Sequence, residues 1–189
     1  MPPQIAVLGW GSLLWEVRHE FDAQHDDWRF DGPSLKLEFS RVSKTRLGAL
    51  TLVIDPINGA DCTVAWCISR RNGVEDAVAD LRCREGTTLG NTGRLLTSQS
   101  ENRSPDSDTE KEILRWASAR GLDAVVWTAL TSNFADKVKS PFSIDEALDY
   151  LKRLSPAAKV KAAEYIWRAP EFIRTPVRTA VTQATWFHA

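Results

Sequence analysis

The chain has 189 residues, of which 43% are hydrophobic and 26% charged, and its formal net charge is −1. This length and composition fit a soluble globular protein with a proper core, so we expect a single domain over 1–189. Because no long basic or acidic run is present, the charge pattern gives no support for binding to nucleic acid or to a membrane surface.

The number and spacing of cysteines and histidines indicate the cellular compartment of the protein and whether it holds a metal site. Three cysteines, an odd number without a C-x-x-C pair, favour a reduced cytoplasmic protein. The three histidines share no metal-ligand spacing with them, so we expect no metal site, and nothing indicates a cofactor. No run reaches transmembrane length, and the N-terminus lacks the pattern of a signal peptide, so no membrane partner is expected.

A glycine-rich loop follows the first predicted strand. Ile5–Leu8 predicts a short buried strand, and the next residues are Gly9-Trp10-Gly11-Ser12-Leu13. Gly9 and Gly11 can adopt backbone angles closed to other residues, and the loop N–H groups can then converge on a carboxylate or phosphate. Neither a dinucleotide fingerprint, a P-loop nor a G-x-S-x-G elbow fits. The loop is therefore either a backbone cradle for an anion or an ordinary strand-ending turn.

The next part of the chain predicts strands in succession. Residues 16–33 indicate loop with a helical turn. Apolar residues from Leu35 to Phe39 alternate with Lys36, Glu38 and Ser40, which predicts a half-buried strand with these polar side chains on its other face. Further strands are expected at 49–55 and 62–68, with a turn at 55–59 between them. Such an order suggests an antiparallel meander or a small barrel.

A helix with an unusual carboxylate follows. Asn72 is a suitable cap, and apolar residues then repeat with helical spacing at Val74, Ala77, Val78 and Leu81. The same spacing places Glu85 on the apolar face, whereas Arg82 and Arg84 project elsewhere. Gly86 offers a stop. Since burying a charge is costly, Glu85 is either a functional carboxylate or a residue of a frayed helix end turned into water.

The remaining elements are predicted from caps, stops and periodicity. We expect a strand at 93–96, a surface loop at 99–108, a helix from there to about 120, and a central strand at 124–130. Two more helices are expected over 143–154 and from Ser155-Pro156 to before Pro170. Residues 172–187 indicate an extended tail that adds an edge strand or closes a pocket.

Two of these stretches resemble a known family. Gly9-Trp10-Gly11-Ser12-Leu13 resembles the Tyr-Gly-Ser-Leu loop after strand one of the gamma-glutamylcyclotransferase-like superfamily, with Trp10 where the family usually has Tyr. Leu81-Arg82-Cys83-Arg84-Glu85-Gly86 resembles the family's helix end, which carries its catalytic Glu before Gly. The stretch from Phe39-Ser40-Arg41 to Arg46-Leu47-Gly48 is more loosely similar to the strand and basic loop between them. The resemblance covers about residues 5–130.

The resemblance implies an α+β fold, a small mixed or antiparallel β-barrel with flanking helices. It also implies that the α-amine of a γ-glutamyl compound attacks its own γ-carbonyl, giving 5-oxoproline and a free amine or amino acid. Glu85 suits the general acid and base of this metal-independent step. The N–H groups of Trp10 to Leu13 would hold a carboxylate or the developing oxyanion. Arg41 or Arg46 could assist, although a solvated surface charge also explains each of them.

Two other functions are compatible with the same residues. The first is a non-catalytic small-molecule binding protein on the same fold, a reading that the Trp10 substitution favours. The second is a thiol enzyme that uses Cys83 with a histidine, although Cys83 would point about 200° away from Glu85 on a helix. The sequence leaves the γ-glutamyl compound and the oligomeric state open.

Overall fold

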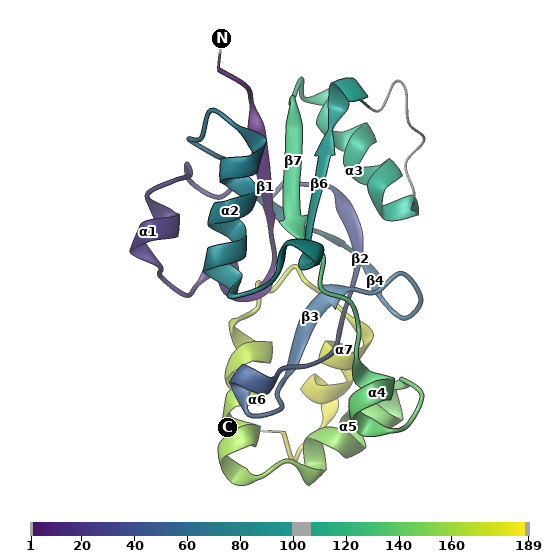
Figure 1. Ribbon diagram of the computed structural model, residues 1–189. Helices are drawn as coiled ribbons and strands as arrows, with labels where there is room; N and C mark the ends of the chain where they lie inside the picture. The colour runs from purple at the N-terminus through teal and green to yellow at the C-terminus, as the bar shows by residue number, and fades with distance from the viewer. Residues whose placement is uncertain (1, 100–106, 188–189) are drawn as a thin grey trace. The chain divides into compact units, whose positions relative to one another are not determined.

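The protein has a mixed α+β fold, which confirms the coarse class expected from the sequence. The structure is a computed structural model that describes residues 2–99 and 107–187. Its contacts divide the chain into two compact units, each assembled from three segments (Figure 1). Unit 1 takes Met1–Gly9, Glu16–Leu35 and Thr63–Leu130, and unit 2 takes Trp10–Trp15, Lys36–Cys62 and Thr131–Ala189. We describe each unit by itself, and the single domain expected over 1–189 stays a prediction.

Unit 1 contains a four-stranded sheet. Its strands are β1 (Ile5–Gly9), β5 (Ala65–Ile68), β6 (Thr92–Leu96) and β7 (Ala124–Thr128), in the order β5-β1-β7-β6. β1 runs parallel to β7, whereas the β1–β5 and β6–β7 pairs are antiparallel. All five residues of β7 are buried, which confirms the central strand predicted from its continuous apolar run.

Among the described residues of unit 1, three segments form α-helices: α1 (His19–Asp22), α2 (Val74–Glu85) and α3 (Asp108–Ala119). Short 3₁₀ helices cover Leu89–Asn91 and Thr97–Gln99. The predicted apolar stripe packs α2 against β7, because Ala77, Val78 and Leu81 are buried. The predicted stop is also confirmed: Gly86 has φ +57°, and the amides of Gly86 and Thr87 donate to carbonyls of the last helical turn. The residue before α2 is Gly73 rather than the expected cap Asn72.

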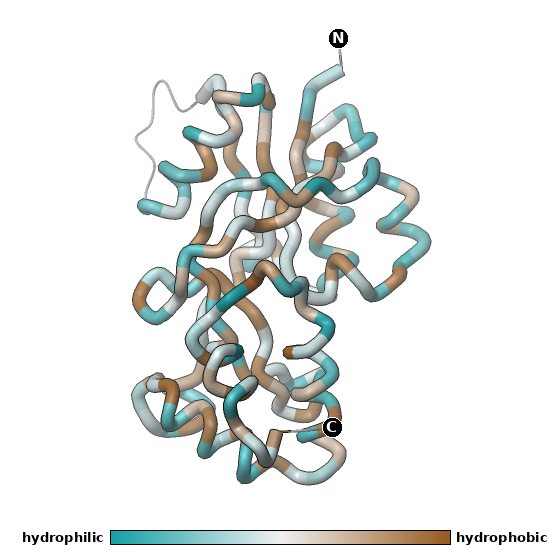
Figure 2. The backbone as a smooth tube through the Cα atoms, turned by 180° about the vertical axis from the view of Figure 1, so that it is seen from behind, coloured by the Kyte–Doolittle hydropathy of each residue, from teal (hydrophilic) through white to brown (hydrophobic). Residues whose placement is uncertain are grey.

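Unit 2 combines a small sheet with four helices. The sheet has the order β3-β2-β4, with strands β2 (Ser34–Val42), β3 (Leu50–Ile54) and β4 (Ala60–Thr63). The helices are α4 (Phe134–Val138), α5 (Ile144–Arg153), α6 (Pro156–Arg168) and α7 (Pro176–Gln183). Two 3₁₀ helices, η1 (Gly11–Leu14) and η2 (Lys44–Arg46), complete the unit. The chain alternates between hydrophobic and hydrophilic along its C-terminal helices, as expected for helices with one buried face (Figure 2).

Three elements differ from the prediction. The expected extended tail contains α7, because Thr175 caps it by accepting from the Arg178 amide and Pro176 occupies its first position. The strand expected at 62–68 is two strands, β4 and β5, separated at Val64, whose amide donates to the Pro33 carbonyl. The short helix α4 was not predicted from the sequence.

The described strands form two sheets and no closed barrel, so the expected barrel is not seen in this part of the chain. The predicted surface loop at 99–108 lies mostly outside the described residues. Within 2–99 and 107–187, no helix is both long and apolar enough to cross a membrane. The same ranges contain no group of three or more His, Cys, Asp or Glu side chains placed to hold a metal ion.

Candidate functional site

The loop after β1 depends on one glycine. Gly11 has φ +66° and begins η1, so the predicted need for glycine is confirmed at this position. Gly9 is different, because it continues β1 opposite Ala65 and its φ is not positive. Trp10, Gly11, Ser12 and Leu13 are all buried. The special conformation therefore belongs to Gly11 alone among the predicted loop residues.

The close approach that Gly11 allows is made by Tyr165 of α6. A Cβ atom at position 11 would overlap the Tyr165 hydroxyl oxygen and would lie 3.2 Å from the ring carbon that bears it. Tyr165 is only 6% exposed and packs edge-on against Trp15 and Phe39, with ring centroids 5.2 and 6.2 Å away. Sequence reasoning missed Tyr165, which lies at a buried position of an amphipathic helix like any core residue.

The two predicted arginines have different surroundings within unit 2. The guanidinium of Arg46 lies over the Tyr165 ring, 4.9 Å from its centroid, so Arg46 and Gly11 contact the same side chain. Arg41 donates to the Thr131 carbonyl over 2.7 Å, and burial lowers the pKa of its guanidinium. Arg41 therefore has a structural role at the edge of β2, whereas Arg46 lies with the loop.

Replacing Gly11 by alanine should destabilise the protein by about 2–4 kcal/mol, from a left-handed backbone angle and from overpacking. The overpacking part depends on the Tyr165 hydroxyl. Gly11→Ala should therefore cost less in a Tyr165→Phe background than in the parent, by about 1 kcal/mol. Urea unfolding of the four proteins of this double-mutant cycle measures the difference. Additive effects of the two changes would show that the hydroxyl does not constrain position 11.

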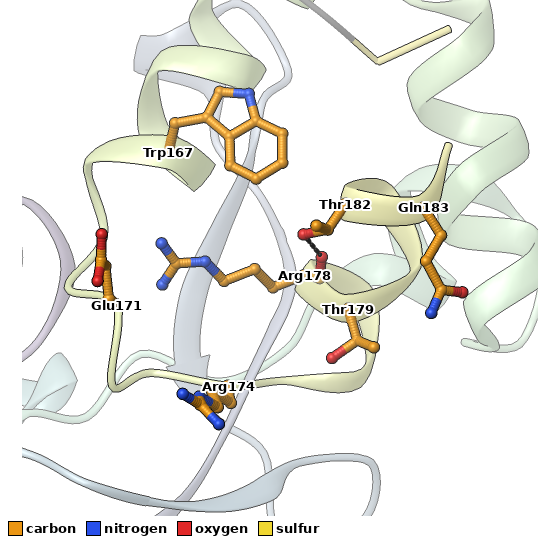
Figure 3. Close-up of a pocket in the computed structure, with 7 residues that line it drawn as sticks. All are labelled: Trp167, Glu171, Arg174, Arg178, Thr179, Thr182 and Gln183. Carbon is orange, nitrogen blue, oxygen red and sulfur yellow. Dashed lines mark hydrogen bonds between the residues drawn. The ribbon is translucent and has the colours of Figure 1, made fainter. Parts of the chain in front are cut away.

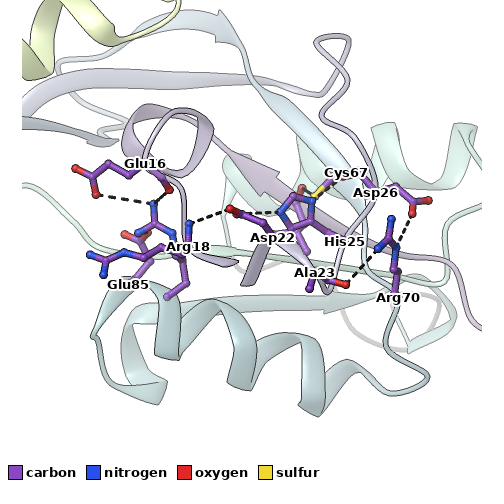
Figure 4. Close-up of polar contacts among 11 residues, drawn as sticks. Glu16, Arg18, Asp22, Ala23, His25, Asp26, Cys67, Arg70 and Glu85 are labelled. Atoms are coloured by element: carbon purple, nitrogen blue, oxygen red, sulfur yellow. Dashed lines mark hydrogen bonds and ion pairs between the residues drawn. The ribbon is translucent and has the colours of Figure 1, made fainter. Parts of the chain in front are cut away.

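Glu85 is the last residue of α2, in unit 1 (Figure 4). Its side chain is 18% exposed, and one carboxylate oxygen lies 3.7 Å from a guanidinium nitrogen of Arg84. The Arg84 side chain is only 3% exposed; it donates to the Glu16 carbonyl over 3.1 Å and lies 3.9 Å from the Glu16 carboxylate. The expectation that Arg84 projects away from Glu85 is therefore wrong, because the long side chain at the helix end folds back onto its neighbour.

The predicted juxtaposition of the loop with Glu85 stays a prediction. Gly9 and Glu85 belong to unit 1, whereas Trp10 to Leu13 belong to unit 2. Cys83 is exposed, and no hydrogen bond joins it to a histidine among the described residues. His25 instead lies against the Asp26 carbonyl, 2.6 Å from Nδ1, and 3.7 Å from the Asp22 carboxylate (Figure 4). The contacts of the described histidines thus give the thiol hypothesis no support.

Sequence reasoning also missed a buried carboxylate in unit 2. Glu38 and Ser40 are 0% exposed, although the alternation along β2 had placed both on its solvent face. Glu38 pairs with Val53 in regular register, and the register shift of β2 against β3 comes only after it, between Glu38 and Arg41. This face of β2 is buried at Glu38 because α7 covers it, and the Val177 amide of α7 donates to the carboxylate. The period of one strand carries no information on such a distant partner.

Backbone amides hold the Glu38 carboxylate at the start of α7. One oxygen accepts from the Phe39 amide over 2.7 Å, and the other accepts from the Val177 amide over 3.2 Å. Burial raises the pKa of Glu38 from its ordinary value of 4.5 to about 7; hydrogen bonds from Thr175, Phe39 and Val177 oppose this rise, and the charge of Asp55 adds to it. Glu38 therefore titrates near neutral pH.

The pKa of Asp55 is displaced in the opposite direction from that of Glu38. Burial by itself would raise the pKa of Asp55, but hydrogen bonds from the Asn58 amide, the Ser40 hydroxyl, the Asn58 side chain and the Ile57 amide outweigh it, and the pKa is lowered. The Ser40 bond is 2.7 Å long and buried. Two carboxyl groups of one small sheet thus have pKa values displaced in opposite directions, a pattern that also marks acid–base sites.

No protein-family model and no curated protein matches the chain. The family resemblance of the Gly9–Leu13 loop and of the Glu85-Gly86 helix end therefore stays a prediction. The contacts of the candidate residues place Gly11 next to Tyr165 and Glu85 next to Arg84.

Proposed function

We propose that this protein is a γ-glutamyl cyclotransferase that converts a small γ-glutamyl compound to 5-oxoproline and a free amine or amino acid. Glu85 is the general acid and base, and neither a metal nor another cofactor takes part. A cytoplasmic location and a fold of the gamma-glutamylcyclotransferase-like type belong to the same proposal. The mixed α+β class is compatible with that fold.

The observation that carries the proposal is the setting of Glu85. The Glu85 carboxylate lies at a helix end and is largely shielded from bulk water, with 18% of its side chain exposed. One carboxylate oxygen of Glu85 lies 3.7 Å from a guanidinium nitrogen of Arg84, and this contact helps to hold the carboxylate in place at the helix end. A general acid and base must be positioned within reach of the proton that it transfers, so a held carboxylate supports the role assigned to Glu85.

In the proposed reaction, Glu85 takes a proton from the substrate α-ammonium. The freed amine attacks the γ-carbonyl carbon, a C–N bond closes the five-membered ring, and the bond to the departing nitrogen breaks. Glu85 then gives that proton to the departing nitrogen. The ring nitrogen loses its second proton as the lactam forms, and the released amine takes up this proton to become an ammonium group, so no net proton is consumed. Because the attack is intramolecular, holding the substrate folded lowers much of the barrier. The loop N–H groups and Arg46 are assigned to the substrate carboxylate or to the developing oxyanion.

The test is product formation from a panel of γ-glutamyl compounds: glutathione, γ-glutamyl amino acids and γ-glutamylamines. We expect 5-oxoproline and the free amine to appear in equal amounts with at least one of them. The alternative, a non-catalytic small-molecule binding protein, is favoured by Trp10 at the position where the family usually has Tyr. Saturable binding of a γ-glutamyl compound without release of 5-oxoproline would establish that alternative and would contradict the cyclotransferase.

A further inference from the structure

A pocket in unit 2 lies apart from the residues assigned above. Its volume is about 460 Å³, within the range of small-molecule sites, and it lies between the end of α6 and one face of α7 (Figure 3). The side chains that matter for its chemistry are Trp167, Glu171, Arg174, Arg178 and Gln183. They combine one large ring, two guanidinium groups, one carboxylate and one amide.

The cationic part of the pocket is not neutralised by an ion pair. Arg178 donates to the carbonyls of Ala169, Pro170 and Ile173, which hold its guanidinium in place as it reaches toward Trp167 and Glu171 (Figure 3). Burial lowers the pKa of Arg178, and the charge of Glu171 opposes this shift. Within the described ranges, no carboxylate lies within 4.0 Å of Arg178 or Arg174, so Glu171 attracts Arg178 only from a longer distance. A partly desolvated cation without a carboxylate at ion-pair distance favours binding of an anion.

The remaining groups narrow the class of ligand. Trp167 is 39% exposed, and its ring centroid lies 5.9 Å from that of Phe187, so part of the Trp167 side chain remains available at the rim. The Thr179 and Thr182 hydroxyls donate to helix carbonyls of Thr175 and Arg178, and Arg178 uses part of its guanidinium on three carbonyls. The Arg174 guanidinium, the remaining N–H groups of Arg178 and the Gln183 amide are then the donors for an oxyanion. Glu171 carries the opposite charge and would repel such a ligand.

We propose that this pocket binds a small molecule in which a carboxylate or phosphate group is attached to a flat ring. The oxyanion lies toward Arg174 and Arg178, and the ring lies against Trp167. The proposal goes beyond the cyclotransferase and does not depend on it, because it uses none of the residues assigned to that reaction. Either source of the oxyanion, a carboxylic acid or a phosphate ester, has the chemistry that the two guanidinium groups recognise.

Chemical-shift titration of the full-length protein with four small molecules tests the proposal. Benzoate and phenyl phosphate carry both ring and anion, benzamide has the ring alone, and acetate has the anion alone. We expect saturable binding of benzoate, phenyl phosphate or both, and at least tenfold weaker binding of the other two. The better of the two anions identifies the oxyanion that the pocket prefers.

Four single variants tie the binding to the pocket. Arg174→Gln should weaken binding about tenfold, because one charge-assisted hydrogen bond is lost. Trp167→Ala should weaken it about three- to tenfold through the lost ring contact. Glu171→Gln should tighten it about twofold or more, since a repelling charge is removed. Arg168→Gln, one residue beyond Trp167 on α6 and ion-paired with Glu164, is the matched control and should change nothing.

Arg178 is left intact in this test because its three carbonyl contacts hold the segment between α6 and α7. The proposal is wrong if neither ring-bearing anion binds saturably. It is also wrong if benzamide binds as tightly as benzoate, or if Arg174→Gln and Trp167→Ala bind like the parent. Weaker binding in Glu171→Gln would contradict the assigned orientation of the ligand.

Discussion

Glu85→Gln is expected to lower turnover of the γ-glutamyl substrate by about 10²–10⁴-fold. Glutamine has nearly the shape of glutamate but cannot carry a proton from the α-ammonium to the departing nitrogen, and general acid–base catalysis is worth this factor. The substitution should also lower the free energy of unfolding by about 1–3 kcal/mol. The reason is that the 3% exposed Arg84 loses a charged partner 3.7 Å away. Turnover at saturating substrate and urea unfolding, both at pH 7.5, measure the two effects.

Glu16→Gln is the matched control for this prediction. Glu16 offers Arg84 a second carboxylate at 3.9 Å, but its carbonyl, which the substitution keeps, makes the closer contact of 3.1 Å. We expect a stability loss of at most about 1 kcal/mol and turnover close to that of the parent. Full turnover in Glu85→Gln would place the catalytic group elsewhere. Equal losses of turnover in the two variants would show that activity depends on holding Arg84 rather than on a proton shuttle.

Glu38→Gln is expected to change how stability depends on pH. Folding raises the pKa of Glu38 from 4.5 to about 7, so between these values the folded protein binds more protons at this site than the unfolded chain. The contribution of Glu38 to stability is therefore most favourable below pH 4.5. This contribution falls as pH rises through about 7. The total fall is about 3 kcal/mol, because each pKa unit corresponds to 1.36 kcal/mol. Glutamine does not titrate, so the variant does not lose this stability as pH rises.

The measurement is the free energy of unfolding of the parent and of Glu38→Gln at several pH values from 4 to 8. At any one pH, the difference in unfolding free energy between parent and variant also includes the altered contacts of the Phe39 and Val177 amides. The test is therefore how this difference changes with pH. Between pH 4 and pH 8 it should change by about 3 kcal/mol in favour of the variant.

Asp55→Asn supplies the control of opposite sign. The pKa of Asp55 is lowered by folding, so Asp55 contributes stability that is present above its ordinary value of 3.8 and is lost as pH falls through the folded value. The Asn variant should therefore compare worst with the parent at neutral pH, and its disadvantage should shrink only below pH 3.8, so this pair is followed to more acidic values than the Glu38 pair. A difference between parent and Glu38→Gln that stays constant with pH would mean that Glu38 titrates like an exposed carboxylate.

The elements that the sequence predicted well are those with a local cause. The α2 stop at Gly86, the Ser caps of α5 and α6, and the buried strand β7 each depend on a few neighbouring residues. The predicted extended tail is wrong where α7 forms, and the cause is again local. Thr175 caps this helix and Pro176 occupies its first position, so two neighbouring residues begin α7.

The parts that could not be predicted depend on distant residues. Whether the polar face of β2 meets water is decided by α7, whose Val177 amide reaches Glu38 across 139 positions of the chain. In the same way, the need for glycine at position 11 was predictable from the motif, but the reason for it, the Tyr165 hydroxyl, lies in α6. Periodicity within one segment carries no information on such partners.

The segments of the two units alternate along the chain, and the chain leaves the ribosome N-terminus first. Synthesis therefore completes unit 1 before unit 2. Every segment of unit 1 has been made once Leu130 is complete, whereas unit 2 still lacks Thr131–Ala189. Until those residues arrive, β2 and the fully buried strand β3 have no helices to cover them. On a nascent chain at neutral pH, Glu38 is therefore a hydrated, ionised side chain beside apolar strands. Closing unit 2 requires this carboxylate to lose its water when α7, the last helix of the described chain, docks.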